Sequence, residues 1–180
     1  MAHRPYVAVV GPSDATSQEK RAAATIGRGL AEAGAILITG GLGGVMEAAC
    51  HGASTADGTT VGFLPGTDRT SANDYLQIAL PTGLGELRNG LIIRAADVVI
   101  AVGGAYGTLS EIALSLRTDV PVVGLDTWDV EGIERVDTPA EAVSRALGLA
   151  TARTDGTDAT DGTDATDGTD ATDRTGRTDS

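Results

Sequence analysis

Two glycine-rich segments, Gly40-Gly41-Leu42-Gly43-Gly44 and Gly103-Gly104-Ala105-Tyr106-Gly107-Thr108, carry the clearest chemical signal in this sequence. Each follows an apolar run typical of a β-strand and precedes a segment with a helical pattern. A glycine turn that opens a helix directs backbone N–H groups and the positive end of the helix dipole toward one place, which favours a bound phosphate. The sequence therefore predicts a site for a phosphorylated small molecule, with binding residues Gly11, Ser13, Gly40, Gly41, Gly43, Gly44, Met46, Arg88, Asn89, Gly103, Gly104, Tyr106, Gly107, Thr108 and Glu111.

Two charged residues accompany the turns and are the candidates for chemistry. Arg88 lies between the turns, where it could hold a phosphate or be one of several solvated charges on its helix. Glu111 follows Gly107 by four residues, so it could face the ligand or only offset the dipole of its helix. The glycines also have an alternative interpretation without any ligand, as tight turns between packed strands and helices. Lys20, the only lysine, falls outside any lysine-bearing motif, so we expect no pyridoxal phosphate chemistry.

Strand-like and helix-like segments alternate along the chain, and their order predicts how these residues are positioned. The predicted strands are 6–10, 35–39, 59–64, 97–102 and 120–125, with a loop at 67–75 that could cover a ligand and a short apolar segment at 76–80. Ser17 is the predicted cap of the first helix, which runs to about residue 33, and further helices are predicted over about 45–56 and 85–96. Another helix follows the second glycine turn and runs to about residue 117, with Glu111 in its first turn, and Thr138 caps a last helix that ends near residue 149. This order predicts an α/β fold, a single Rossmann-like doubly wound parallel sheet with helices on both faces and ligands at the carboxyl ends of its strands.

Residues 151–180 differ in kind from the rest of the chain. From Thr154 the hexamer Thr-Asp-Gly-Thr-Asp-Ala occurs three times, with no large apolar residue. Such a segment cannot offset the entropy of ordering, and a calcium-binding repeat would carry a regular apolar position that this one does not have. We therefore predict one nucleotide-binding domain over residues 1–150 and a disordered acidic tail over 151–180.

The composition excludes several classes of partner. The net charge of −12 leaves no basic stripe for nucleic acid, and no apolar run reaches the length of a membrane span. The start of the chain shows no signal-peptide core, which predicts a cytoplasmic location. Cys50 is the only cysteine and His3 and His51 are the only histidines, so we expect no metal site.

The motif Gly103-Gly104-Ala105-Tyr106-Gly107-Thr108-Leu109-Ser110-Glu111 resembles the PGGxGTxxE motif of the LOG family, a Rossmann superfamily long labelled lysine decarboxylases. The segment from Gly40 to Ala48 resembles the other glycine motif of that family. Residues 81–89 and 94–97 are more similar still to the sister branch that contains the molybdenum cofactor carrier proteins. The resemblance runs from about residue 6 to residue 128, and it implies a homo-oligomer.

The resemblance implies two kinds of function for one phosphate site. The first is a protein that binds a nucleotide or a nucleotide-like cofactor, such as the molybdenum cofactor, at the glycine turns. The alternative is a nucleoside 5′-monophosphate phosphoribohydrolase, which releases free base and ribose 5-phosphate and requires no cofactor. In that enzyme Arg88 and Glu111 would be the catalytic residues, because they match the arginine and glutamate implicated in catalysis in the family.

The chain departs from the hydrolase pattern at three positions, with Val102 in place of proline, Glu47 in place of glycine and Asn89 in place of lysine. The missing lysine removes a positive charge beside the predicted phosphate, which favours the binding protein over the hydrolase. Tyr106 is the best-placed aromatic residue to stack on a base, although it could equally pack against a neighbouring subunit. A structural domain without any small ligand is the third interpretation.

Overall fold

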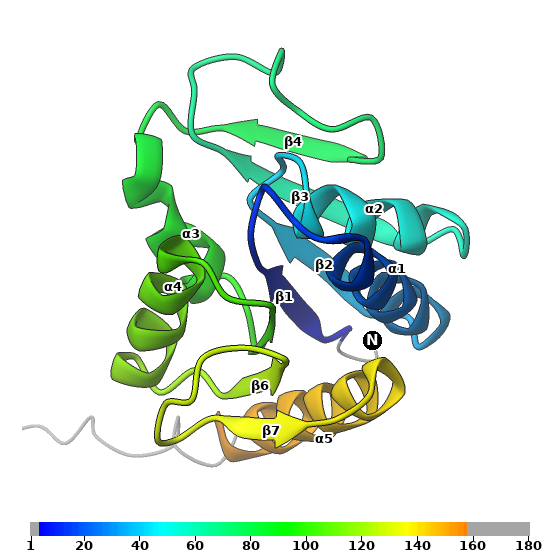
Figure 1. The fold of residues 1–180 in the computed structure, drawn as a ribbon, viewed down its shortest axis with the longest axis vertical. Helices are drawn as coiled ribbons and strands as arrows, with labels where there is room; N and C mark the ends of the chain where they lie inside the picture. Colours follow the sequence, from blue (N-terminus) through cyan, green and yellow to red (C-terminus); the bar gives the residue numbers. More distant parts are fainter. Residues whose placement is uncertain (1–3, 158–180) are drawn as a thin grey trace, which may run out of the picture.

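A sheet of seven parallel strands lies at the centre of the molecule, which a computed structural model describes for residues 4–157 (Figure 1). The strand order is β4-β3-β2-β1-β5-β6-β7, and every neighbouring pair is parallel. The strands are β1 (Tyr6–Val10), β2 (Ile36–Thr39), β3 (Thr59–Leu64), β4 (Ile78–Pro81), β5 (Val98–Val102), β6 (Val122–Leu125) and β7 (Glu134–Val136). The predicted α/β fold with a doubly wound parallel sheet is confirmed.

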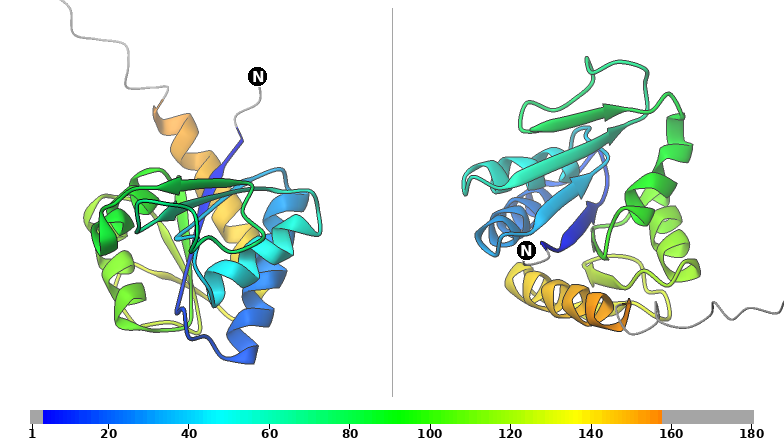
Figure 2. Two further views of the ribbon diagram at one scale, coloured as in Figure 1. Left: turned by 90° about the horizontal axis from the view of Figure 1, so that it is seen from above. Right: turned by 180° about the vertical axis from the view of Figure 1, so that it is seen from behind.

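Helices cover both faces of the sheet, as predicted. One face carries α1 (Ser17–Glu32), α2 (Val45–Ser54) and α5 (Pro139–Thr157), and the other carries the 3₁₀ helix η1 (Gly85–Arg88), α3 (Asn89–Arg94) and α4 (Tyr106–Arg117) (Figures 1 and 2). Alternate residues of a central strand therefore enter different cores: Val7 and Val9 pack toward α1, whereas Ala8 and Val10 pack toward α3 and α4. Burial on both faces explains why these strands consist almost wholly of apolar residues.

The chain reverses its direction of travel across the sheet between β1 and β5. From β1 it moves outward through β2 and β3 to β4, and α3 then returns it to β5 on the other side of β1. The connections after β1 and β5 consequently diverge to opposite faces of the sheet. A crevice at the carboxyl ends of two such strands is the usual place for a ligand in a doubly wound fold.

Two strands escaped the sequence analysis because both are short edge strands. The segment 76–80 overlaps β4, whose residues alternate between exposed and half-buried. The strand β7 has three residues and no apolar run, although residues 120–125 were predicted to hold the last strand. An edge strand buries less of its surface than a central strand does. Its sequence therefore lacks the continuous apolar pattern that identifies a central strand.

Three helix boundaries were also predicted wrongly. Thr16, not Ser17, caps α1: its hydroxyl accepts the Glu19 N–H at 3.2 Å, while the Glu19 carboxylate accepts the Thr16 N–H at 2.7 Å. The predicted helix 85–96 is instead the 3₁₀ helix η1 followed by α3, which ends at Arg94, and Gly85 begins η1 with a φ of 55°, outside the range of regular helices. The last helix continues to Thr157 rather than ending near Leu149, so it includes the start of the predicted tail. The rest of that tail, from residue 158, lies outside the described residues.

Candidate ligand-binding site

A cleft of about 800 Å³ opens at the carboxyl edge of the sheet, where the chain reverses between β1 and β5. This volume lies within the range of roughly 300–1,000 Å³ that small-molecule sites occupy. We call it the switch-point cleft. Five loops and helix ends line it, with residues Gly11, Pro12, Ser13, Leu42, Met46, Pro65, Gly85, Glu86, Leu87, Arg88, Asn89, Ala105, Tyr106, Gly107, Thr108, Ser110 and Glu111.

Arg88, at the end of η1, brings a buried positive charge to this cleft. Its side chain is only 7% exposed, and one terminal nitrogen, Nη1, donates a hydrogen bond to Oδ1 of Asn89 at 2.7 Å. The Nε atom of the same guanidinium is buried without a hydrogen-bond partner. Burial lowers the pKa of Arg88, and the charges of Glu111 and Glu86 oppose that shift. A buried donor on a cation is costly to leave unpaired, so Nε calls for a hydrogen-bond partner that the protein does not supply.

Glu111, in the second turn of α4, is the acidic counterpart of Arg88. It is also 7% exposed, and burial raises the pKa of its carboxyl to about 7, against the opposing attraction of the Arg88 charge. The carboxyl is therefore poised to gain or lose a proton near neutral pH, which is a property common at functional sites. The sequence left open whether Glu111 faces a ligand or only offsets the helix dipole. Its place in the cleft lining favours the first interpretation.

The start of α4 presents unused hydrogen-bond donors to the same cleft. The N-cap position is Ala105, whose side chain cannot cap the helix, and the first backbone bond within α4 is from Leu109 to the Ala105 carbonyl. Thr108, in the first turn, is 1% exposed and its hydroxyl has no hydrogen-bond partner. Gly107 has open space where a Cβ would stand, so a ligand can approach the backbone there. Uncapped N–H groups and a free hydroxyl suit a phosphate oxygen.

The structure brings most of the predicted site residues together, but six of the predicted glycines lie outside the cleft lining. The predicted residues that line the cleft are Gly11, Ser13, Met46, Arg88, Asn89, Tyr106, Gly107, Thr108 and Glu111. The predicted residues that do not line it are Gly40, Gly41, Gly43, Gly44, Gly103 and Gly104.

The first glycine turn is occupied by bonds within the protein. The Gly41 N–H donates to the Thr39 hydroxyl at 3.0 Å, and the Gly41 carbonyl accepts the N–H of Asn73. Gly44 has a φ of 68°, and a Cβ there would collide with the carbonyl of Pro12. The loop 67–75, predicted to cover a ligand, lies over this turn through Asn73 and contributes no residue to the cleft lining. Packing, rather than direct contact with the cleft, therefore accounts for these glycines.

The second glycine turn packs against two side chains outside the cleft. Gly103, at a φ of 68°, leaves no room for a Cβ beside the Glu19 carboxylate, and a Cβ at Gly104 would stand 3.2 Å from the Trp128 indole nitrogen. Trp128 donates from that nitrogen to the Ala105 carbonyl at 3.1 Å, and its ring lies 6.0 Å from that of Tyr106. Trp128 thus braces the start of α4. The sequence analysis missed it, although its place soon after a buried strand marks it as a residue of the carboxyl edge.

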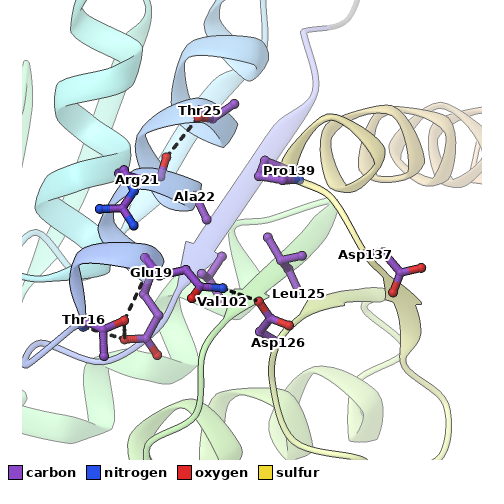
Figure 3. A pocket seen from close by; sticks show the side chains of 11 residues that line it. Thr16, Glu19, Arg21, Ala22, Thr25, Val102, Leu125, Asp126, Asp137 and Pro139 are labelled. Atoms are coloured by element: carbon purple, nitrogen blue, oxygen red, sulfur yellow. Dashed lines mark hydrogen bonds between the residues drawn. The ribbon is translucent and has the colours of Figure 1, made fainter.

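A second hollow of about 490 Å³ lies at the same edge, on the face of α1 and α5 (Figure 3). Its polar groups are largely bonded to one another: Thr16 and Glu19 form the cap of α1, and Gln18 donates to Asp126. Figure 3 shows Thr16 and Glu19 joined by hydrogen bonds, with Asp137 set apart from this pair. We call this space the capped hollow, because the residues that cap α1 line it. None of the predicted site residues lines it.

The described part of the chain shows neither a metal-binding cluster nor a membrane-spanning helix. Within residues 4–157, no group of three or more His, Cys, Asp and Glu side chains is arranged to hold a metal ion. Across the same residues, every helix is too short or too polar to cross a membrane. Lys20 is on α1 and is not among the residues of the switch-point cleft.

Comparison with known proteins gives the same fold and a consistent set of relatives. The model of the SLOG cluster4 family matches residues 4–152. An uncharacterized protein of Archaeoglobus fulgidus is 40% identical over 142 residues, which are 78% of this chain and 93% of that protein. The solved structure of the molybdenum cofactor binding protein from Rippkaea orientalis is 34% identical with a TM-score of 0.79, over 83% of this chain and 99% of that one. The molybdenum cofactor carrier protein of Chlamydomonas reinhardtii is 33% identical with a TM-score of 0.75, over the same shares.

Proposed function

Because the chain belongs to the SLOG cluster4 family, we propose that its switch-point cleft binds a phosphorylated, nucleotide-like cofactor and holds it without turning it over. The molybdenum cofactor is the ligand that two of the similar solved structures suggest, since their proteins bind or carry it. In this proposal the phosphate lies at the start of α4, and the remainder of the ligand occupies the cleft toward Leu42 and Pro65. The resemblance of the chain to the molybdenum cofactor carrier branch supports this assignment.

One observation carries the proposal: two buried polar atoms of this cleft, Nε of Arg88 and Oγ1 of Thr108, have no partner within the protein. Buried polar groups are almost always hydrogen-bonded, so each such atom calls for an explanation. An anionic ligand supplies one, because it accepts from the guanidinium, the hydroxyl and the uncapped N–H groups of α4 at once. The donor set therefore fits a phosphate ester, and it requires no metal bound by the protein itself.

Titration of the protein tests this function directly. Trp128 is the only tryptophan of the chain and contacts the start of α4, so its fluorescence should report a ligand in the cleft. We expect saturable quenching or enhancement with the molybdenum cofactor and a weaker response with AMP. The Arg88→Met variant should lose the response, whereas Arg94→Met, which removes an exposed charge on α3, should retain it. No saturable response to either ligand would overturn the proposal.

Hydrolysis of a nucleoside 5′-monophosphate is the second candidate, and the pair of Arg88 and Glu111 favours it. Cleavage of the N-glycosidic bond develops positive charge on the ribose, which the Glu111 carboxylate would stabilise while Arg88 holds the phosphate. Asn89 is neutral where the hydrolase pattern has lysine, and this difference favours the binding function. The assay is release of free base from AMP by the wild type and by Glu111→Gln. Release that depends on Glu111 would select the enzyme, and no release from folded protein would select the carrier.

We further propose that the protein associates with itself beside this cleft. Leu87 on η1 is 81% exposed and Tyr106 on α4 is 83% exposed, and both line the cleft. Leu84, just before η1, and Leu91 on α3 add further exposed apolar surface. Sedimentation velocity should show a homo-oligomer that Leu87→Glu dissociates, and a wild-type monomer at micromolar concentration would contradict it. A cytoplasmic location stays a prediction from the sequence.

A further inference from the structure

The Arg88 guanidinium is held by two neighbours that leave its charge intact. Asn89 accepts a hydrogen bond from Nη1 at 2.7 Å, and the amide oxygen that accepts it carries no net charge. A carboxylate at this position would form an ion pair and cancel much of the positive charge that an anionic ligand would meet. The neutral acceptor therefore fixes the orientation of the guanidinium at small electrostatic cost to ligand binding.

Gly40, at the end of β2, provides the second constraint. A Cβ at this position would stand 2.6 Å from Nη1 and 2.7 Å from Nη2 of Arg88, and also 2.7 Å from the sulfur of Met46. Real Cβ atoms do not approach heavy atoms so closely. Gly40 is not among the residues with positive φ, so a side chain here would compete for space rather than strain the backbone, and the flexible ends of Arg88 and Met46 would have to shift to admit it. The Arg88 guanidinium occupies the space that a side chain at residue 40 would need.

From these two contacts we infer that Gly40 and Asn89 are positioning residues, which seat the Arg88 guanidinium so that its unpartnered Nε can bind the anionic group of the ligand. The inference rests on the proposed function and deepens it. It gives the first glycine turn a role in the site that does not require contact with the ligand. Met46, on α2, borders the same space, because its sulfur lies 2.7 Å from where a Cβ of residue 40 would stand.

The test is a double-mutant cycle on binding of two probes, AMP and inorganic phosphate. Asn89→Leu removes the amide oxygen that accepts from Arg88 and replaces it with a side chain of similar size. Gly40→Ala places a methyl group in the space that the guanidinium occupies. We expect each variant to weaken binding by about tenfold, the usual scale for one hydrogen bond to a charged group. In an Arg88→Met background, the same two changes should have no further effect on binding, because the group that they position is gone.

The controls separate positioning from other roles. Gly148→Ala on α5, where a Cβ meets open space, should leave binding unchanged. Losses that add fully to that of Arg88→Met would overturn the inference, because they would mean that Asn89 or Gly40 acts on the ligand independently. If Gly40→Ala disturbs folding, Asn89→Leu still decides the test. Residue 89 is half-buried, and leucine there does not take up the space of the guanidinium.

A second readout is independent of any ligand. In nitrogen NMR spectra of the arginine side chains, a seated guanidinium rotates slowly and gives separate signals for Nη1 and Nη2. The Arg88 signals, identified by their loss in Arg88→Met, should be separate in the wild type and merge in Asn89→Leu. Merged signals in the wild type would overturn the inference. If the wild type binds neither probe nor the molybdenum cofactor, the proposed function fails, and these spectra still decide whether Arg88 is seated.

Discussion

The switch-point cleft and the capped hollow share the carboxyl edge of one sheet, but their polar groups differ in whether they are hydrogen-bonded within the protein. In the capped hollow, the Thr16 hydroxyl and the Glu19 carboxylate satisfy the start of α1. In the switch-point cleft, α4 begins at Ala105 without a side-chain cap, and the hydroxyl of Thr108 has no partner. Both are open spaces of a size that admits a small molecule.

This difference is the ground on which we propose the switch-point cleft as the binding site, because it is the unsatisfied polar groups, rather than the open volume, that distinguish it from the capped hollow. A helix end that the protein has capped offers nothing to an anion, because its donors are already used. A helix end left open beside a buried arginine costs stability in the free protein, and a ligand recovers that cost when it binds. The variants below test this contrast.

The largest expected effect is the loss of the buried charge in the switch-point cleft. Arg88→Met should weaken binding of AMP or the molybdenum cofactor by about 100-fold or more, since it removes a charge-assisted contact from a site shielded from water. Arg21→Met is the matched change in the capped hollow, where Arg21 is exposed, and it should leave the dissociation constant within twofold. Isothermal titration calorimetry measures both. If both variants lost affinity equally, the proposal that the ligand binds in the switch-point cleft and not in the capped hollow would be wrong.

The next effect is a dependence of stability on pH that arises from Glu111. The ordinary pKa of the carboxyl is 4.5, and burial raises it to about 7 in the folded protein. Between these values the unfolded chain has released the proton and the folded protein still holds it, so stability falls as pH rises from about 4.5 to 7. The full cost above pH 7 is on the order of 3 kcal/mol.

Glu111→Gln should remove this fall, because the amide does not titrate. The free energy of unfolding in urea, measured from pH 5 to pH 8, should therefore decline less in the variant than in the wild type. Other titrating groups are common to both proteins and cancel in the difference. Parallel curves for the two proteins would show that Glu111 is not held in its protonated form.

A smaller effect is expected from the two buried hydroxyls without partners, Thr108 and Thr127. Thr108→Val should weaken ligand binding by about tenfold, since the hydroxyl would bond an anion. Thr127→Val is the matched control, because Thr127 does not line the cleft. Both variants should raise the free energy of unfolding by up to about 1 kcal/mol, since each replaces an unsatisfied hydroxyl by a methyl group. Equal weakening of binding by the two variants would contradict the proposed site.

The smallest effect belongs to the capped hollow. Thr16→Ala removes the cap of α1 and should lower the free energy of unfolding by about 1 kcal/mol. It should leave the dissociation constant of AMP unchanged, because the cap serves the helix and not a ligand. Thermal unfolding and fluorescence titration of one preparation measure both quantities. A loss of binding without a loss of stability would assign the capped hollow a role in recognition.

The sequence by itself determined the architecture and the two charged residues of the site, Arg88 and Glu111. Central strands such as Tyr6–Val10 and Val98–Val102 are apolar on both faces, so their parallel arrangement followed from the residue pattern. Arg88 and Glu111 were identified from their place among the glycine motifs, and the structure brings them to one cleft. The edge strands β4 and β7 were missed because a short, half-exposed strand has no periodic signal strong enough to identify it.

Only the tertiary structure decided what each glycine does. The local pattern of a glycine turn is the same whether the backbone has open space beside it, as at Gly107, or the chain packs tightly against it, as at Gly44. The partners that distinguish these cases come from distant segments: Pro12 approaches Gly44, and the Arg88 guanidinium fills the space beside Gly40. Contacts between residues far apart in sequence depend on how the layers pack, and no pattern within a single segment encodes them.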